Sequence, residues 1–265
     1  MMELTGYLAT VFIGVSLGLI GAGGSILCVP VMVYLFSIKP LEATSYSLFI
    51  VGTSSAIGAF NNYRKGLVHF DIAFTMGLFS IAGIFITRLL IMPAIPSNLG
   101  TVGHYTIRKS FVSMILFAVL MLCASFSMTR GAALKGTRQE RGKQKNRVKL
   151  SLCGIAIGFI AGLSGIGGGF LLIPSLILFA GIPMKEAVAT SLLIITMNCA
   201  IGFAADARHF PFDWSFLFRM TAFAMSGIIA GIFFGKKIQS PDLKKIFGWL
   251  VMVIGSGILI KEIFI

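Results

Sequence analysis

Charged residues are scarce in this chain. Only 12% of its 265 residues are Asp, Glu, Lys or Arg, whereas soluble domains carry about 25%. The remainder is strongly apolar, because 57% of the residues are hydrophobic and the mean hydropathy is +0.95. Most of the chain falls into apolar tracts of the ~20 residues that a helix needs to cross a bilayer, and the alternation of a β-barrel is absent. We therefore predict an all-α integral membrane protein that crosses the cell (inner) membrane several times.

Acidic residues are the rarest charged type. The chain has nine Asp and Glu residues, and none falls in the middle of a predicted span. A cation transporter or a proton pump places acids deep in its helix bundle, so their absence favours an anionic or neutral substrate. Asp71, Asp206 and Asp213 lie at predicted helix ends. There they would cap a helix or pair with the arginines near these ends, which are Arg64, Arg208 and Arg219.

Histidine and cysteine are also few. The three histidines lack metal-ligand spacing, and the four cysteines lie in apolar tracts without CxxC spacing. The sequence signatures of zinc proteases, serine hydrolases, P-loop proteins and c-type haem proteins are absent. We therefore expect no enzyme activity, no metal and no cofactor. The cysteines are interpreted as small buried apolar residues: Cys28, Cys123, Cys153 and Cys199.

Basic residues are abundant, but they gather between the apolar tracts. The formal net charge is +13, and Lys and Arg crowd one polar connection, "TRGAALKGTRQERGKQKNRVK" at residues 129–149. Such an excess marks a cytoplasmic loop rather than a nucleic-acid-binding face. Anionic membrane lipid is the expected partner of these cations. The start of the chain, "MMELTGYLATVFIGVSLGLIG", lacks the cation that precedes a secretory signal, so we expect it to be kept as the first helix.

The two halves of the sequence resemble each other. A shift of 144 positions aligns residues 18–64 with residues 162–208 without a gap, and about 17 of the 47 columns are identical. Shared apolar composition alone does not give this agreement, which indicates an internal duplication. We therefore predict a first transmembrane repeat at 1–128, a basic cytoplasmic linker at 129–149 and a second transmembrane repeat at 150–265.

Each repeat is predicted to contain four to five helices, the first of them interrupted by glycine. Eight crossings would give both repeats the same orientation and place both termini in the cytoplasm, but they would leave the lysines within 236–245 outside. A fifth crossing per repeat, made at the glycines, would invert the second repeat, an arrangement common among transporters. We favour eight crossings over ten. The predicted segments lie near 4–37, 42–62, 71–91 and 108–128, and near 148–181, 186–205, 213–236 and 244–264.

Both interrupted helices carry a glycine motif, "GLIGAGGSILCVP" at 18–30 and "GLSGIGGGFLLIP" at 162–174. Glycine lets the backbone leave helical dihedral angles, and the helix that restarts presents free N–H groups at its positive end. Such helix starts bind anions, and paired interrupted segments mark the central site of many transporters. The alternative is that the glycines only let helices pack closely. We predict that these residues bind the substrate: Gly21, Gly23, Gly24, Ser25, Gly165, Gly167, Gly168 and Gly169.

Polar side chains in the second helix of each repeat can complete this site. Ser47, Ser191 and Asn198 can each donate a hydrogen bond to an anion, although such residues also bond to their own helix or to a neighbouring one. Charged and basic residues follow these helices. They are candidates for gating or for coupling to protons: Arg64, Asp206, Arg208 and His209.

These motifs resemble those of a known family. The duplicated glycine motifs, the segments "EATSYSL" and "EAVATSL", and the basic clusters "YRKG" and "ARHF" are similar to the TauE/SafE sulfite-exporter family. The likeness covers both repeats and nearly the whole chain. It implies an inner-membrane protein that moves sulfite, thiosulfate, sulfoacetate or a related organosulfur anion.

We therefore expect a secondary transporter that exports a small sulfur-containing anion bound between the two repeats. An interior-negative potential drives an anion outward without a coupling ion. Two alternatives stay open: a proton-coupled anion importer that uses Asp206 or His209, and a membrane scaffold whose glycines only pack helices. The anionic substrate and membrane lipid are the expected partners, nucleic acid is not, and the sequence leaves a homo-oligomer open.

Overall fold

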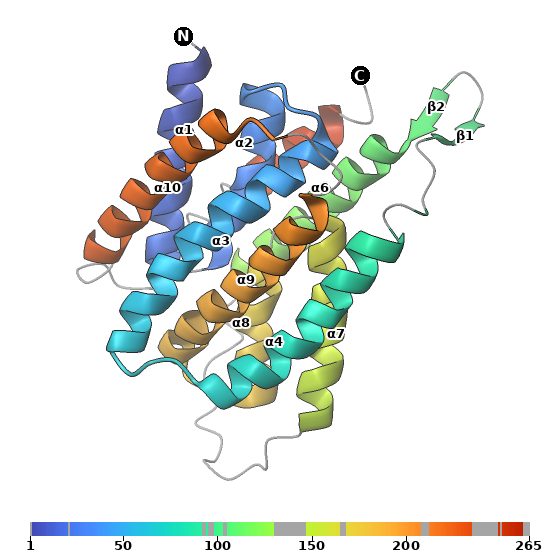
Figure 1. Ribbon diagram of the computed structural model, residues 1–265. Helices are drawn as coiled ribbons and strands as arrows, with labels where there is room; N and C mark the ends of the chain where they lie inside the picture. The colour runs from blue at the N-terminus through green and yellow to red at the C-terminus, as the bar shows by residue number, and fades with distance from the viewer. Residues whose placement is uncertain are drawn as a thin grey trace.

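Helices make up most of the computed structural model (Figure 1). It describes residues 2–20, 22–91, 94, 98–102, 105–129, 147–164, 168–207, 212–234, 249 and 251–261. In chain order the helices are α1 (Met2–Ile20), the 3-10 helix η1 (Ala22–Leu27), α2 (Cys28–Leu35), α3 (Pro40–Arg64), α4 (Phe70–Phe85), the π-helix η2 (Ile86–Ile91), α6 (Lys109–Thr129), α7 (Arg147–Ser164), α8 (Gly169–Ala180), α9 (Met184–Asp206), α10 (Trp214–Phe234) and a C-terminal helix (Val251–Lys261).

One short hairpin departs from the all-helical prediction. β1 (Asn98–Val102) pairs antiparallel with β2 (Tyr105–Arg108) between η2 and α6. The segment is too short and too polar to cross a bilayer, so the hairpin adds a local turn to a helical bundle without changing its class.

Several helices are apolar enough to lie in a membrane. Among the described residues, three helices have the length and composition to cross one: Phe70–Ile91, Met184–Asp206 and Trp214–Phe233. Shorter apolar helices accompany them. Large apolar side chains are exposed on the outer faces, including Phe74, Leu78 and Phe233, each at 60% or more. A soluble protein rarely exposes so much apolar surface, so the prediction of a helical membrane protein is confirmed.

The centre of the bundle is formed by α3 and α9, which run antiparallel. Ser45 near the start of α3 contacts Asp206 at the end of α9. Further along α3, Gly58 faces Leu192 of α9. The ten-span interpretation predicts this antiparallel packing, because it inverts the second repeat. The eight-span interpretation that the sequence favoured predicts parallel helices at these positions.

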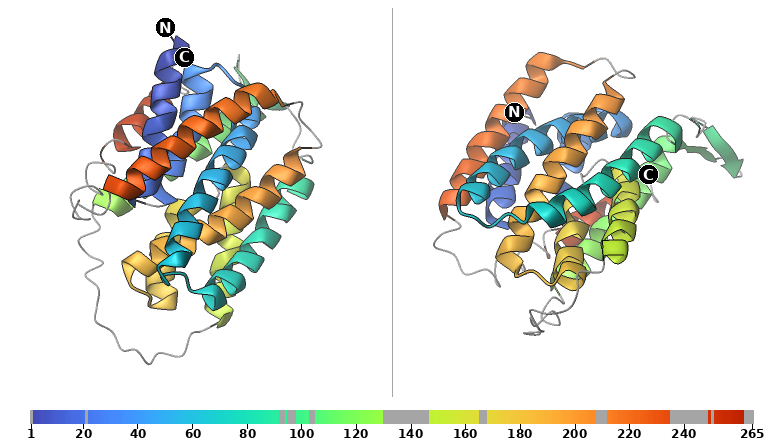
Figure 2. Two further views of the ribbon diagram at one scale, coloured as in Figure 1. Left: turned by 60° about the vertical axis from the view of Figure 1, so that its left-hand side comes forward. Right: turned by 60° about the horizontal axis from the view of Figure 1, so that its bottom comes forward.

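Two outer helix pairs run parallel, α1 with α10 and α4 with α7 (Figure 2). A Cβ added at Gly14 of α1 would lie 2.1 Å from the Ala224 carbonyl oxygen of α10. A Cβ added at Gly158 of α7 would lie 2.0 Å from the Ser80 carbonyl oxygen of α4. Both pairs therefore bring their backbones into direct contact, as small residues allow in membrane helices.

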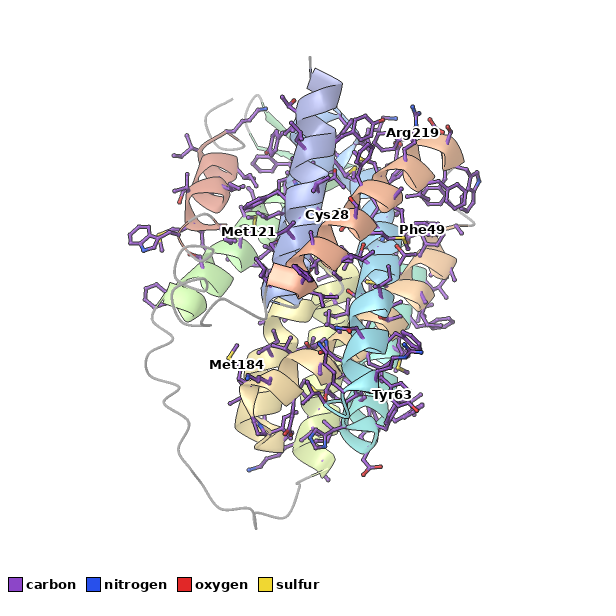
Figure 3. All side chains as sticks on the ribbon, turned by 90° about the vertical axis from the view of Figure 1, so that its left-hand side faces the viewer. Cys28, Phe49, Tyr63, Met121, Met184 and Arg219 are labelled. Atoms are coloured by element: carbon purple, nitrogen blue, oxygen red, sulfur yellow. The ribbon has the colours of Figure 1, made fainter. Side chains whose placement is uncertain are left out.

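These directions give the bundle two distinct ends. Tyr63 at the end of α3 and Met184 at the start of α9 lie toward one end, and Arg219 near the start of α10 lies toward the other (Figure 3). We call the first end the linker end, because α7 begins there, within the basic linker of the sequence. We call the second end the hairpin end, because η2 ends there, shortly before β1 in the sequence.

Candidate functional site

The first glycine motif lies in η1. Gly23, Gly24 and Ser25 belong to this 3-10 helix, which separates α1 from α2, and Ser25 is fully buried. Gly21 lies outside the described residues. Contacts of η1 with α8 and α9 bring the first motif against helices of the second half of the chain.

The second glycine motif lies between α7 and α8. Gly165 and Gly167 are outside the described residues, but Gly168 adopts a φ of 74° and Gly169 begins α8. A Cβ at Gly168 would lie 2.9 Å from Ile157 Cγ2 and 3.0 Å from Ala161 Cβ, both in α7. Glycine is therefore needed at residue 168 both for the left-handed backbone and for close packing.

We expect Gly168→Ala to lower the free energy of unfolding by about 2–4 kcal/mol, because backbone strain and a close contact act together. Gly181→Ala is the matched control. Gly181 also has a positive φ, of 65°, but its added Cβ would meet nothing within 4 Å, so its loss is expected to be about 1 kcal/mol. Thermal unfolding in detergent measures both. Equal losses would show that the contact with α7 contributes nothing.

The three predicted polar ligands differ in their hydrogen-bond partners. The Ser191 hydroxyl donates to the Val188 carbonyl of its own helix at 2.8 Å, which is a common local bond. Ser47 is fully buried beside Cys28. Asn198 Nδ2 donates to Ser80 Oγ of α4 at 2.7 Å, while its buried Oδ1 has no hydrogen-bond partner among the described residues. Ser47 Oγ is likewise buried without a hydrogen-bond partner among the described residues, and as a hydroxyl it can donate to an anion, whereas the free atom of Asn198 can only accept.

Asp206 differs most from its prediction. It is the last residue of α9, as expected, but its side chain is only 7% exposed and forms an ion pair with Arg88 of η2. It also accepts a hydrogen bond from Ser45 Oγ of α3. The arginine that pairs with Asp206 is thus not one of the three expected near the helix ends. Of these, Arg64 ends α3 at the opposite, linker end and lies over the Phe60 ring at 5.0 Å.

The remaining polar residues near these helix ends form local contacts where the structure describes them. Arg208 and His209 lie outside the described residues. Asp213 was expected at a helix end, and its Oδ1 accepts a hydrogen bond from the Phe216 backbone N–H at 3.1 Å, as a cap of α10 does. Arg219 donates from Nε to the Ser215 carbonyl of its own helix at 3.2 Å.

Arg88 is a candidate functional residue that the sequence interpretation missed. It lies in "FITRLLI", near the end of the apolar segment predicted at 71–91, and its side chain is 2% exposed. Its Nη1 donates to Asp206, but Nε and Nη2 are buried without a partner among the described residues. A lone cation inside an apolar run was the available signal, because such residues usually mark ion or substrate pathways.

The local backbone sets Arg88 apart as well. The π-helical turn of η2 follows α4 directly. Such turns are rare, mostly single, and frequently found at functional sites. A buried ion pair is costly to form in an apolar bundle, so it contributes little net stability and is better explained by a role.

Polar contacts follow one another along the interface between α4 and α9. The first, at the linker end, is 2.5 Å long between His69 Nε2 and Glu186 Oε2, and both side chains are partly exposed. The second, in the middle of the interface, is the 2.7 Å hydrogen bond from Asn198 to Ser80. The third, toward the hairpin end, is the buried ion pair of Arg88 with Asp206.

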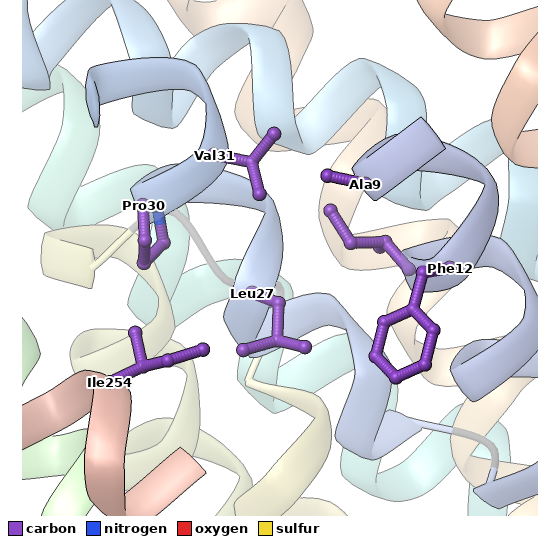
Figure 4. Close-up of a pocket in the computed structure, with 7 residues that line it drawn as sticks. Ala9, Phe12, Leu27, Pro30, Val31 and Ile254 are labelled. Carbon is purple, nitrogen blue, oxygen red and sulfur yellow. The ribbon is translucent and has the colours of Figure 1, made fainter. Parts of the chain in front are cut away.

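A separate apolar cleft of about 150 Å³ lies between α1, the start of α2 and the C-terminal helix (Figure 4). Every lining side chain is apolar, so the cleft offers no group that could hold an anion. Its lining residues are Ala9, Phe12, Ile13, Leu27, Pro30, Val31 and Ile254.

Comparison with known proteins identifies relatives along almost the whole chain. The family model described as "Sulfite exporter TauE/SafE" matches residues 7–258. A "Probable membrane transporter protein" of Xylella fastidiosa is 27% identical, with 93% of this chain and 91% of the relative covered. "Probable membrane transporter protein YunE" of Bacillus subtilis is 26% identical, with 93% of each chain covered. A "Probable membrane transporter protein" of Methanocaldococcus jannaschii is 24% identical, with 94% and 92% covered. No solved structure matches this chain significantly.

Proposed function

Since the chain belongs to the sulfite exporter TauE/SafE family, we propose that it is a secondary transporter that exports a small sulfur-containing anion, such as sulfite, thiosulfate or an organosulfonate. The observation that carries the proposal is the buried Arg88, whose Nε and Nη2 have no hydrogen-bond partner in the part of the chain that the structure describes and can hold an oxyanion inside the bundle. The relatives named as membrane transporters support the transport class.

We further propose that the chain is built from two inverted repeats, 1–128 and 150–265, joined by the linker 129–149. The shift of 144 positions that aligns the halves in sequence also relates their helix contacts. It carries Gly14 of α1 to Gly158 of α7, and it carries Gly83 of α4 to Gly227 of α10. The contact of Gly14 with Gly227 thereby corresponds to the contact of Gly158 with Gly83. The substrate would bind between the repeats, near the helix breaks at the glycine motifs.

The linker end is proposed to face the cytoplasm. The cations of the linker precede Lys149 of α7, and Arg64, Lys65 and Lys185 lie at the same end. α10 also ends at the linker end, at Phe234, and Lys236 and Lys237 follow two and three residues later in the sequence. The inverted arrangement thus gathers on one side the lysines that eight crossings would have left outside, as the positive-inside rule favours. The start of α1 then faces the outside.

Cysteine labelling tests this orientation. In a variant whose exposed cysteines are replaced by alanine, Ala207→Cys at the hairpin end should react with an impermeant thiol reagent added to intact cells. Gln144→Cys and Lys185→Cys should react only after the membrane is opened. Eight crossings predict the reverse at residues 185 and 207, so labelling of Lys185→Cys without labelling of Ala207→Cys would contradict the inverted arrangement.

Export follows from the charge of the substrate. An interior-negative potential is worth about 2.3 kcal/mol per charge per 100 mV, so a dianion is driven outward by about twice that amount. Import would need a coupling ion. The candidate for proton coupling among the described residues is Asp206, whose carboxylate is already engaged by Arg88 and Ser45.

Ligand-induced stabilisation separates a transporter from a scaffold. A ligand that binds the folded state raises the unfolding temperature by an amount that grows with the logarithm of its concentration above Kd. The purified protein should be stabilised in this way by sulfite, thiosulfate or methanesulfonate, measured against sodium chloride at equal ionic strength. Identical melting curves in all four salts would contradict the proposed function and favour a scaffold. Uptake that requires a pH gradient would instead favour the proton-coupled importer.

A further inference from the structure

The buried ion pair is incomplete on one side. The Arg88 guanidinium carries five N–H donors, and within the described ranges Nη1 alone is engaged, by the Asp206 carboxylate. Nε and Nη2 form the other edge of the same planar group, and both are buried without a partner among the described residues. Because an unsatisfied charged donor is costly in an apolar interior, this edge is expected to be occupied when the protein works.

That edge has the shape of an oxyanion receptor. Nε–H and Nη2–H point in parallel, so they can donate to two oxygens of one sulfonate, sulfite or thiosulfate group. A lysine there would offer a point charge without this two-pronged geometry.

Asp206 fixes the opposite edge. Its carboxylate accepts from Nη1 of Arg88 and from the Ser45 hydroxyl, so α9, α3 and η2 all meet at this point. The carboxylate therefore orients the guanidinium and neutralises its charge while the site is empty. It also limits affinity, because an entering anion meets a site whose net charge is zero.

We propose that Arg88 is the residue that binds the transported oxyanion, through Nε and Nη2, with Asp206 as its internal counter-ion. This site rests on the proposed anion transport and adds to it a ligand outside both glycine motifs.

The test uses the full chain in detergent, with thiosulfate as the probe and sodium chloride at equal ionic strength as the reference. Arg88→Gln alone would leave a buried unpaired carboxylate, which is strongly destabilising, so the informative variant is Arg88→Gln/Asp206→Asn. It keeps the net charge of the parent, and its two amides can still hydrogen bond to each other. Arg219→Gln, an exposed arginine on α10, controls for loss of a positive charge.

The variants are expected to differ in their affinity for thiosulfate. The parent and Arg219→Gln should bind thiosulfate alike. Asp206→Asn should bind it at least tenfold more tightly, because the anion then supplies the only counter-charge. Arg88→Lys should bind at least tenfold more weakly, and Arg88→Gln/Asp206→Asn should fold but show no thiosulfate-induced stabilisation.

Two results would overturn the assignment in different ways. If Arg88→Gln/Asp206→Asn binds thiosulfate as the parent does, Arg88 is not the ligand, while anion binding by the protein stands. If thiosulfate, sulfite and methanesulfonate stabilise neither the parent nor Asp206→Asn, the proposed function fails and this site fails with it.

Discussion

Gly158→Val is expected to prevent formation of the native bundle, with a loss of stability of more than about 3 kcal/mol. An added Cβ would lie 2.0 Å from the Ser80 carbonyl oxygen and 2.8 Å from Ser80 Cα. These are backbone atoms, so no side-chain rotation can relieve the overlap, and α4 and α7 would have to separate. The measurement is the yield of monodisperse protein by size exclusion, which should fall at least tenfold.

Gly257→Val is the matched control for this variant. Gly257 also lies within a helix, but a Cβ added there meets nothing within 4 Å. Its yield and unfolding temperature should stay close to those of the parent. Equal yields of the two valine variants would contradict the direct contact of α4 with α7.

Asp206→Ala is expected to destabilise the protein by about 3–5 kcal/mol, because it leaves the Arg88 charge buried without its partner. Such a loss corresponds to a fall of roughly 10 °C in the unfolding temperature of a chain of this size. Thermal unfolding in chloride measures it. Added thiosulfate should restore part of the loss, because an anion bound at Arg88 replaces the missing negative charge.

Asp71→Ala is the control for loss of a carboxylate. Asp71 is exposed in the first turn of α4, so its replacement should change stability by no more than about 1 kcal/mol. If Asp206→Ala is as stable as Asp71→Ala, the ion pair with Arg88 does not form in the folded protein.

Hydropathy predicted the long helices well. The segments expected at 42–62, 71–91 and 186–205 correspond to α3 at Pro40–Arg64, to α4 with η2 at Phe70–Ile91, and to α9 at Met184–Asp206. A run of apolar residues long enough to cross a bilayer has few other stable conformations, because every backbone group must be hydrogen bonded internally. Element type was therefore readable from composition alone.

The direction of those helices was not readable in the same way. A hydropathy profile is the same whichever way a helix crosses, so only the placement of cations could decide between eight and ten spans. The lysines at 236, 237, 244 and 245 favour ten spans, and the antiparallel packing of α3 on α9 agrees with them.

The buried ion pair was also hidden from sequence reasoning. Arg88 and Asp206 are 118 residues apart, and each lies near the end of an apolar segment, where a charge is ordinarily exposed. Their meeting depends on how η2 and α9 cross, which no local pattern encodes. By contrast, the glycine motifs were visible in the sequence because they are local and repeated. At Gly168, both the packing against α7 and the backbone geometry require glycine.

The most direct measurement of the central claim is the efflux of ³⁵S-labelled thiosulfate from proteoliposomes whose membrane potential is clamped to either sign. The account predicts saturable efflux that is faster when the interior is negative and slower when it is positive, and that is lost in Arg88→Gln/Asp206→Asn. Efflux equal to that of protein-free liposomes, or the same at both potentials and in both proteins, would contradict electrogenic export of an anion held by Arg88.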